Sequence, residues 1–209
     1  MFYGLMNAMP GTERPKTLLE MAGAAAKPAR LGEAVVVVID AQHEYVDGAL
    51  PLPAVQPALD EIGRLLQRAR AKGTPVIHVV HQGKGLFAPG TPGAAIAAPA
   101  APAPGEAVVH KRLPNAFAST DLAERLHALK RGEIVFVGFM THMCVEATAR
   151  AAIDNGFRAT IVAAATATRD LPDPLGGGIV SAAEVQRSSL SALSDRFATV
   201  VADVAALPD

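Results

Sequence analysis

The chain alternates between short, continuously apolar segments and longer segments in which apolar residues recur every three to four positions. Residues 34–40, AVVVVID, form an unbroken β-branched run, which is typical of a strand buried on both faces. Runs of the same kind recur along the chain. We therefore expect further strands over 75–81, 106–111, 133–138, 158–164 and 198–204.

The segments between these strands have helical periodicity. In residues 57–73 the apolar positions share one helical face, and Gly73 follows as a natural C-cap. Capping patterns precede two further helices, with Asp121 and Glu124 opening 121–132 and Ser181 and Glu184 opening 181–197. Helical character also predicts a helix from Cys144 to Gly156 and a short one within 14–25.

Strands that alternate with amphipathic helices indicate βαβ units. The predicted fold is a three-layer α/β sandwich, in which helices cover both faces of a six-stranded, mostly parallel sheet. Residues 31–209 are expected to form this domain, and residues 1–30 an N-terminal arm. The interval 82–105 breaks the rhythm, because it is too rich in proline and glycine for an ordinary helix. A loop of this length is typically a lid or a binding loop, or else a mobile insertion.

Composition and charge limit the possible partners. Half of the residues are hydrophobic and the net charge is −1, without a basic stripe, so neither nucleic acid nor an anionic membrane is an expected partner. The longest apolar runs are too short to span a bilayer. The single cysteine excludes an intrachain disulfide and fits a reducing compartment. Because residues 1–21 lack a signal-peptide pattern, we expect a cytoplasmic protein.

Candidate chemistry gathers at the ends of the expected strands. Asp40 ends the first, His81 the second and Lys111 the third, and Cys144 follows the fourth. Ligands of an open parallel α/β sheet bind outside the carboxyl ends of its strands. An acid, a base, an ammonium group and a thiol are therefore expected at one edge of the sheet.

Cys144 is the expected nucleophile. A helix N-terminus favours a thiolate over a thiol, and a neighbouring Lys111 would lower the thiol pKa further. Asp40 can carry the protons of the reaction. Each residue also has a structural interpretation, since Cys144 can be a small buried side chain, Asp40 a turn cap and Lys111 a solvated surface group. Their shared position at strand ends favours catalysis.

Three motifs carry a family resemblance. VVVVIDAQHEYVDG with Asp40, VVHKRLPNAF with Lys111, and VFVGFMTHMCVEATARAA with Cys144 resemble the isochorismatase-like cysteine hydrolases, which include nicotinamidases, N-carbamoyl amide hydrolases and isochorismatases proper. The motifs come in the family's order, and the likeness runs from about residue 32 to the end of the chain. It implies a six-stranded parallel sheet flanked by helices.

The resemblance also implies roles for single residues. Asp40 would be the general base, Lys111 would orient and stabilise charge, and Cys144 would attack the substrate to give a thioester-like intermediate. A non-proline cis peptide is expected at Met140–Thr141. The backbone amides of Thr141 and Cys144 are expected to form the oxyanion hole.

The remaining expectations concern the pocket, metals and assembly. The substrate pocket is expected to contain Gln42, Tyr45, His81, Phe117 and His142. Nicotinamidases carry an Asp-x-His metal site after the second strand, whereas this chain reads HVVHQGKG there, and His78 and His81 would point to opposite faces of a strand. No metal site and no cofactor are therefore predicted. Members of the family form dimers and larger oligomers, so the resemblance implies a homo-oligomer, a dimer or tetramer.

The expected function is hydrolysis of a small-molecule substrate at an amide or ureido C–N bond. One alternative is isochorismatase-type hydrolysis of a vinyl ether, with Asp40 as the acid and Cys144 uninvolved. Another is a ligand-binding or redox-responsive relative without turnover. The substrate depends on the 82–105 loop and on the first 30 residues, and the sequence does not identify it.

Overall fold

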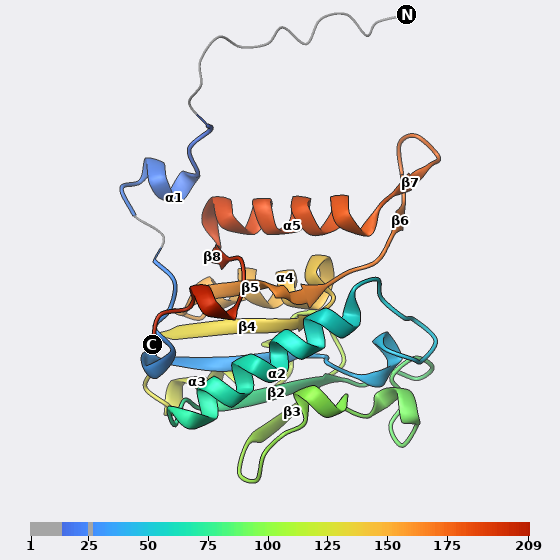
Figure 1. Cartoon of the computed structure of the whole chain (residues 1–209), viewed down its shortest axis with the longest axis horizontal. Helices are drawn as coiled ribbons and strands as arrows, with labels where there is room; N and C mark the ends of the chain where they lie inside the picture. Colours follow the sequence, from blue (N-terminus) through green and yellow to red (C-terminus); the bar gives the residue numbers. More distant parts are fainter. Residues whose placement is uncertain (1–13, 25–26) are drawn as a thin grey trace, which may run out of the picture.

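A parallel sheet forms the centre of the computed structural model, which describes residues 14–24 and 27–209 (Figure 1). Its six strands pair in parallel throughout. Across the sheet they follow the order β3 (Ala107–Lys111), β2 (Val76–His81), β1 (Ala34–Ile39), β4 (Glu133–Phe139), β5 (Arg158–Ala167) and β8 (Ala198–Val201). This confirms the predicted fold class. A small antiparallel hairpin, β6 (Leu171–Pro172) and β7 (Ile179–Val180), projects from the body.

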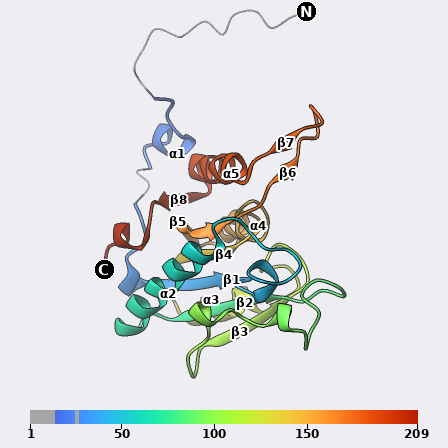
Figure 2. The same ribbon diagram turned by 45° about the vertical axis from the view of Figure 1, so that its right-hand side comes forward.

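Helices cover both faces of the sheet, and Figure 2 shows the layers from a second side. One face packs on α2 (Val55–Ala71), and the other packs on α3 (Leu122–Ala128), α4 (Glu146–Asp154) and α5 (Ala182–Arg196). The rest of the regular structure is short. It comprises α1 (Leu18–Met21), a π-helical turn η5 (Thr141–Val145), and the 3₁₀ turns η1 (Leu31–Glu33), η2 (His43–Tyr45), η3 (Pro92–Ala94), η4 (Ala98–Ala100) and η6 (Val204–Ala206).

The alternation of side chains along β1 explains why the sheet needs both layers. Val36 and Val38 lie in the core under α2, whereas Val35, Val37 and Ile39 lie in the core under α3, α4 and α5. All of these side chains are buried. A continuous β-branched run therefore places apolar surface on both faces of the central strand.

Several boundaries differ from those expected. The helix expected within 14–25 is reduced to α1, where Thr17 and Glu20 form a capping box. Asp121 does not cap α3, because its carboxylate binds Arg125 instead and Thr120 accepts from the Leu122 amide. The capping box of Ser181 and Glu184 is present as expected. The fifth strand continues three residues further, to Ala167, and the last strand ends early because η6 begins at Val204.

The 82–105 loop is packed onto the segment that follows β1. The amide of His43 donates to the carbonyl of Ala95, and the amide of Ala97 donates to the carbonyl of Ala41, both at 2.9 Å. The buried Glu44 carboxylate accepts from the Phe87 amide at 3.3 Å. These contacts favour a fixed cover over a mobile insertion.

The described part of the N-terminal arm lies along the β5–β8 side of its own chain. The Leu18 amide donates to Oδ1 of Asp195 at 2.8 Å, and the Ala29 amide donates to Oγ1 of Thr160 at 2.9 Å. Ala29 already belongs to the core, so the arm joins the domain before residue 31. Within residues 14–24 and 27–209, no helix combines the length and hydropathy needed to cross a membrane.

Candidate active site

The order of the strands places a crevice between the carboxyl ends of β1 and β4. From β1 the chain builds outward through β2 and β3, then returns to the other side of β1 for β4. Such a reversal is the usual ligand-binding position of an open α/β sheet. Asp40 directly follows β1, and Cys144 lies in the turn η5 after β4.

The two strands approach closely at this edge. Ile39 is paired with Gly138, whose φ of +114° favours glycine. A Cβ atom at position 138 would lie 1.9 Å from the Ile39 carbonyl oxygen. Asp40 has a left-handed backbone, with φ of 49°, which turns the chain away directly after the strand. Glycine at 138 is therefore required for the chain path beside Asp40.

The cis peptide lies between Phe139 and Met140, one residue before the expected Met140–Thr141 position. Met140 is extended, and the helical turn η5 begins at the next residue, Thr141. The side chain of Thr141 donates to the Ala167 carbonyl at 3.1 Å and links this turn to the end of β5.

Cys144 is held in the first helical turn after β4. The carbonyl of Met140 accepts from the amides of Met143 and Val145, which closes the turn. The backbone amides of Thr141 and Cys144 do not donate to this carbonyl. An oxyanion hole requires amides that are free to donate to the substrate. Cys144 is 4% exposed, so the thiol is almost completely buried.

Lys111 lies at the centre of the cluster. Its Nζ atom is 2.6 Å from Oδ2 of Asp40, 3.2 Å from Sγ of Cys144 and 3.2 Å from Nδ1 of His81. The side chains of Lys111 and Asp40 are fully buried. The structure thus brings together all four side chains that the strand-end argument selected.

The acidity of Cys144 differs from expectation. Burial and the neighbouring Asp40 carboxylate raise the pKa of the thiol to about 12, although Lys111 acts in the opposite direction. The expectation of a depressed pKa is therefore wrong for the unliganded site. The reason is that desolvation of the buried sulfur outweighs the stabilisation of the thiolate by the ammonium group.

Asp40 is suited to accept the thiol proton. Burial raises the pKa of its carboxyl group, although Lys111 opposes the shift. Its Oδ1 atom accepts no hydrogen bond from any described residue. A buried carboxylate with a free oxygen beside a thiol is a stronger base than one in water.

Histidines 78 and 81 point to opposite faces of β2, as expected. His78 is buried on the α2 side and contacts Oε2 of Glu106 through Nε2 at 2.9 Å. The ring of His81 lies edge-on to Phe87, with the centroids 5.3 Å apart. The two histidines therefore cannot share one metal ion.

Asp40, His81 and Cys144 carry side-chain atoms of the kinds that bind metal ions. One ligand atom each of Asp40, His81 and Cys144 lies within 4.8 Å of the others. The Lys111 ammonium lies within 3.2 Å of all three side chains and already supplies the positive charge at their centre. We therefore do not assign these three residues as metal ligands.

The other expected pocket residues have varied positions. Tyr45 is buried beside Phe87 and Phe139, and burial and the charges of Asp40 and Cys144 raise its pKa. His142 is half-buried and hydrogen-bonds to Thr168. Phe117 is partly buried against the core under α3 and α4 and stacks on Phe157, with ring centroids 6.2 Å apart, and its place in the substrate pocket stays a prediction.

Gln42 has a structural task that the sequence does not reveal. Its Nε2 donates to the carbonyls of His81 and Ala94, and its Oε1 accepts from the His81 amide. The side chain therefore ties the 82–105 loop to the ends of β1 and β2, and its hydrogen-bonding atoms are occupied. It shapes the pocket without offering a free group to a substrate.

A cavity of about 400 Å³ opens beside this cluster. Gln42 and His81 line it together with Gln82, His110 and residues of the loop, including Thr91, Ala94 and Ala95. Of the cluster of Asp40, His81, Lys111 and Cys144, His81 alone is in this lining, so a role of the 82–105 loop in substrate binding stays a prediction. Which loop residues contribute could not be recognised beforehand, because their sequence has no periodic pattern.

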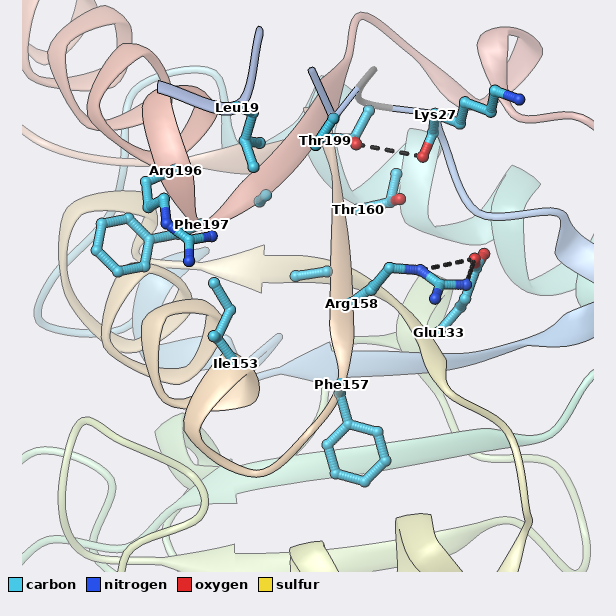
Figure 3. A pocket seen from close by; sticks show the side chains of 13 residues that line it. Leu19, Lys27, Glu133, Ile153, Phe157, Arg158, Thr160, Arg196, Phe197 and Thr199 are labelled. Carbon is cyan, nitrogen blue, oxygen red and sulfur yellow. Dashed lines mark hydrogen bonds and ion pairs between the residues drawn. The ribbon is translucent and has the colours of Figure 1, made fainter. Parts of the chain in front are cut away.

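A second cavity, of about 420 Å³, lies at the opposite end of the sheet (Figure 3). It is bounded by the arm, through Leu19 and Lys27, and by the first residues of β4 and β5, Glu133 and Arg158. Asp40, Lys111 and Cys144 lie at the carboxyl ends of the strands, so this cavity is remote from Cys144.

Comparison with known proteins gives a consistent result. The isochorismatase domain family matches residues 34–203. A secreted isochorismatase effector of Verticillium dahliae is 37% identical over 184 residues, covering 87% of this chain and 94% of that protein. Maleamate amidohydrolase of Pseudomonas putida is 32% identical over 146 residues, covering 61% and 68%. The crystal structure of an isochorismatase from Pseudomonas putida superposes with a TM-score of 0.88 at 40% identity, covering 93% of this chain and 100% of that one.

Proposed function

This chain is a hydrolase of the isochorismatase family, and we propose that it cleaves a small amide or ureido C–N bond with Cys144 as the nucleophile. The contact of one buried ammonium group with both Asp40 and Cys144 carries this proposal. A structural cysteine does not require a buried ion pair beside it, and burying such a pair is costly. The amidohydrolase among the relatives supports C–N cleavage.

The first half of the reaction forms a thioester. Sγ of Cys144 attacks the carbonyl carbon while Oδ1 of Asp40 takes the thiol proton. The backbone amides of Thr141 and Cys144 receive the negative charge that develops on the substrate oxygen. The C–N bond then breaks, and Asp40 returns its proton to the departing nitrogen.

The second half releases the acid. A water molecule attacks the thioester carbonyl, and Asp40 takes a proton from it. The C–S bond breaks, and the proton passes to Sγ, which restores the thiol. The Lys111 ammonium group contacts both side chains and stabilises negative charge on the Asp40 carboxylate and on the departing sulfur of Cys144.

The raised pKa of Cys144 shapes this mechanism. With a thiol pKa of about 12, a free thiolate is rare at neutral pH. Attack and proton transfer to Asp40 must therefore be coupled. Because the pKa of the Asp40 carboxyl group is raised, it lies closer to the pKa of the thiol that gives up the proton. A resting thiol of this kind also resists adventitious oxidation.

A second candidate is vinyl ether hydrolysis of the isochorismatase type. It is favoured by the likeness to the Pseudomonas putida isochorismatase structure. In that reaction Asp40 would protonate the substrate and Cys144 would take no part. The two functions therefore differ in whether the thiol is needed.

The test is a substrate panel assayed with the parent chain and with Cys144→Ala. The panel contains small amides, N-carbamoyl compounds and isochorismate. We expect turnover of an amide or carbamoyl compound and a loss of about a thousandfold or more in kcat for Cys144→Ala. Turnover of isochorismate that survives in Cys144→Ala would favour the second candidate and contradict ours. Thermal melting of both proteins checks that alanine leaves the fold intact.

The remaining proposals concern the surroundings of the enzyme. We propose a small-molecule substrate, no cofactor and a homo-oligomeric assembly. The cytoplasmic location stays a prediction, since the relative from Verticillium dahliae is named as secreted. The division into an arm, residues 1–30, and a catalytic domain, residues 31–209, is likewise a proposal.

A further inference from the structure

His81 completes the environment of the Lys111 ammonium group. A lysine ammonium has three N–H donors and no acceptor. Three acceptor atoms surround Nζ of Lys111, namely Oδ2 of Asp40 at 2.6 Å, Sγ of Cys144 at 3.2 Å and Nδ1 of His81 at 3.2 Å. Lys111 is shielded from water. Without His81, its three N–H donors would have only two acceptor atoms, on Asp40 and Cys144.

We propose that His81 is a positioning residue, whose neutral Nδ1 atom accepts from Lys111 and holds the ammonium group between Asp40 and Cys144. This inference rests on the proposed function only in giving Lys111 a catalytic task. Because lysine can only donate, Nδ1 must carry a lone pair, and the ring proton must lie on Nε2. The geometry therefore selects one of the two neutral tautomers.

The surroundings hold the His81 ring in place. Its backbone amide donates to Oε1 of Gln42 at 2.9 Å, and Gln42 in turn binds the loop at Ala94. Phe87 lies edge-on to the ring and packs on Tyr45, with ring centroids 5.0 Å apart. A ring fixed by its neighbours can fix the ammonium it contacts, because the position of Nδ1 is set in advance.

Protonation of His81 would break this arrangement. A second positive charge would lie 3.2 Å from the Lys111 ammonium, and Nδ1 could no longer accept. The charged or titratable groups around the ring are Lys111 on β3, Asp40 after β1 and Cys144 on η5. Further out, His110 lines the same cavity as His81, and Glu44 binds the amide of Phe87, whose ring contacts His81. Burial and Lys111 lower the pKa of His81, although Asp40 opposes this, so the neutral ring persists below its ordinary range.

Alkylation of Cys144 by iodoacetamide tests the inference without a known substrate. The chain has one cysteine, so every alkylation event reports on this site. His81→Asn keeps an acceptor near Nδ1 but cannot take up a proton, whereas His81→Leu removes the acceptor. His127→Asn, on the exposed side of α3, is the matched control.

At pH 8 we expect alkylation of His81→Asn within about twofold of the parent. His81→Leu is expected to react about tenfold more slowly, which corresponds to a rise of about one unit in the thiol pKa. Equal rates in His81→Leu and the parent, or equal losses in His81→Leu and His81→Asn, would overturn the inference.

The ring nitrogens of His81 give a second measurement that does not depend on the stability of any variant. In ¹⁵N-labelled parent protein at pH 8, we expect the His81 proton on Nε2, with the signal assigned by its absence in His81→Asn. A proton on Nδ1 would overturn the inference. A substrate panel without turnover would contradict the proposed function, but the alkylation and ¹⁵N measurements would remain valid tests of His81. Amide turnover together with an unchanged alkylation rate in His81→Leu would contradict this inference alone.

Discussion

The Nζ atom of Lys111 lies 2.6 Å from Oδ2 of Asp40, and both side chains are fully buried. A buried ion pair stabilises a protein little in comparison with apolar packing, yet removing one member leaves an uncompensated charge and costs about 3–5 kcal/mol. The pair connects the ends of β1 and β3, which are separated in the sheet by β2. Such a pair is more readily explained by chemistry at the crevice than by stability.

The charges of this pair should set the reactivity of Cys144. Burial raises the thiol pKa most, Asp40 raises it further and Lys111 lowers it. Lys111→Met should therefore slow alkylation and Asp40→Asn should speed it, by about tenfold for each pKa unit. Both variants should be inactive on substrate, because one lacks the ammonium and the other the base. Equal alkylation rates in both variants and the parent would show that the three side chains do not interact.

Gly138→Ala should destabilise the fold strongly. The new Cβ would meet the Ile39 carbonyl oxygen at 1.9 Å on a backbone with φ of +114°. Steric overlap and backbone strain together should cost about 2–5 kcal/mol, measured by urea unfolding. Gly132→Ala, where the added Cβ meets no atom within 4 Å, is the control and should change stability by less than about 1 kcal/mol. Similar effects of both substitutions would argue against the close approach of β1 and β4.

Acid should weaken the contacts through which Glu106 holds the end of the 82–105 loop. Burial opposes its charge, but hydrogen bonds from Arg70, the Ala103 amide and His78 hold its pKa down at about 2. A carboxyl group whose pKa is lowered by folding stabilises the folded state at pH values above its unfolded-state pKa, which is near 4.5 for Glu106. This stabilisation is lost as the pH falls from 4.5 to about 2.

Glu106→Gln is therefore expected to lower the free energy of unfolding by about 1–2 kcal/mol at pH 7. The difference from the parent should shrink as the pH falls below 4.5. Glu124→Gln, on the exposed side of α3, should show no such pH dependence. A difference that stays constant between pH 7 and pH 3 would mean that the Glu106 charge is not stabilised in the folded state.

Activity should survive the removal of metal ions. The Lys111 ammonium lies within 3.2 Å of Asp40, His81 and Cys144, and it leaves no space for a second cation among them. We expect full turnover after exhaustive dialysis against a chelator, with the parent dialysed against buffer as the control. Loss of activity that Zn²⁺ or Mn²⁺ restores would show that these donors bind a metal ion.

Deleting residues 1–25 should lower the mass of the assembly. Leu18 and Met21 on α1 are 50% and 70% exposed, so their apolar surface is available to another copy. Residues 1–13, 25 and 26 lie outside the described residues. Light scattering measures the change, and Glu124→Gln, at an exposed polar position on α3, is the control with no expected effect. An unchanged mass after the deletion would exclude the arm from the interface.

The sequence by itself determined the layers and the edge of the site. Continuous β-branched runs and helical periodicity are local properties, so they predicted β1, β2, β4 and α2 almost to the residue. Because parallel strands end at a common edge, Asp40, Lys111 and Cys144 could be placed together without any measured distance. The same reasoning brought His81 to that edge.

Only the tertiary structure decided how these side chains act on one another. The direction of the Cys144 pKa depends on how completely distant segments bury the thiol, and the tautomer of His81 depends on its contact with Lys111. Likewise, Phe117 stacks on Phe157, which is forty residues away in the sequence. Desolvation and hydrogen bonding vary over a few ångströms, whereas a sequence pattern locates a residue only to an element and a face.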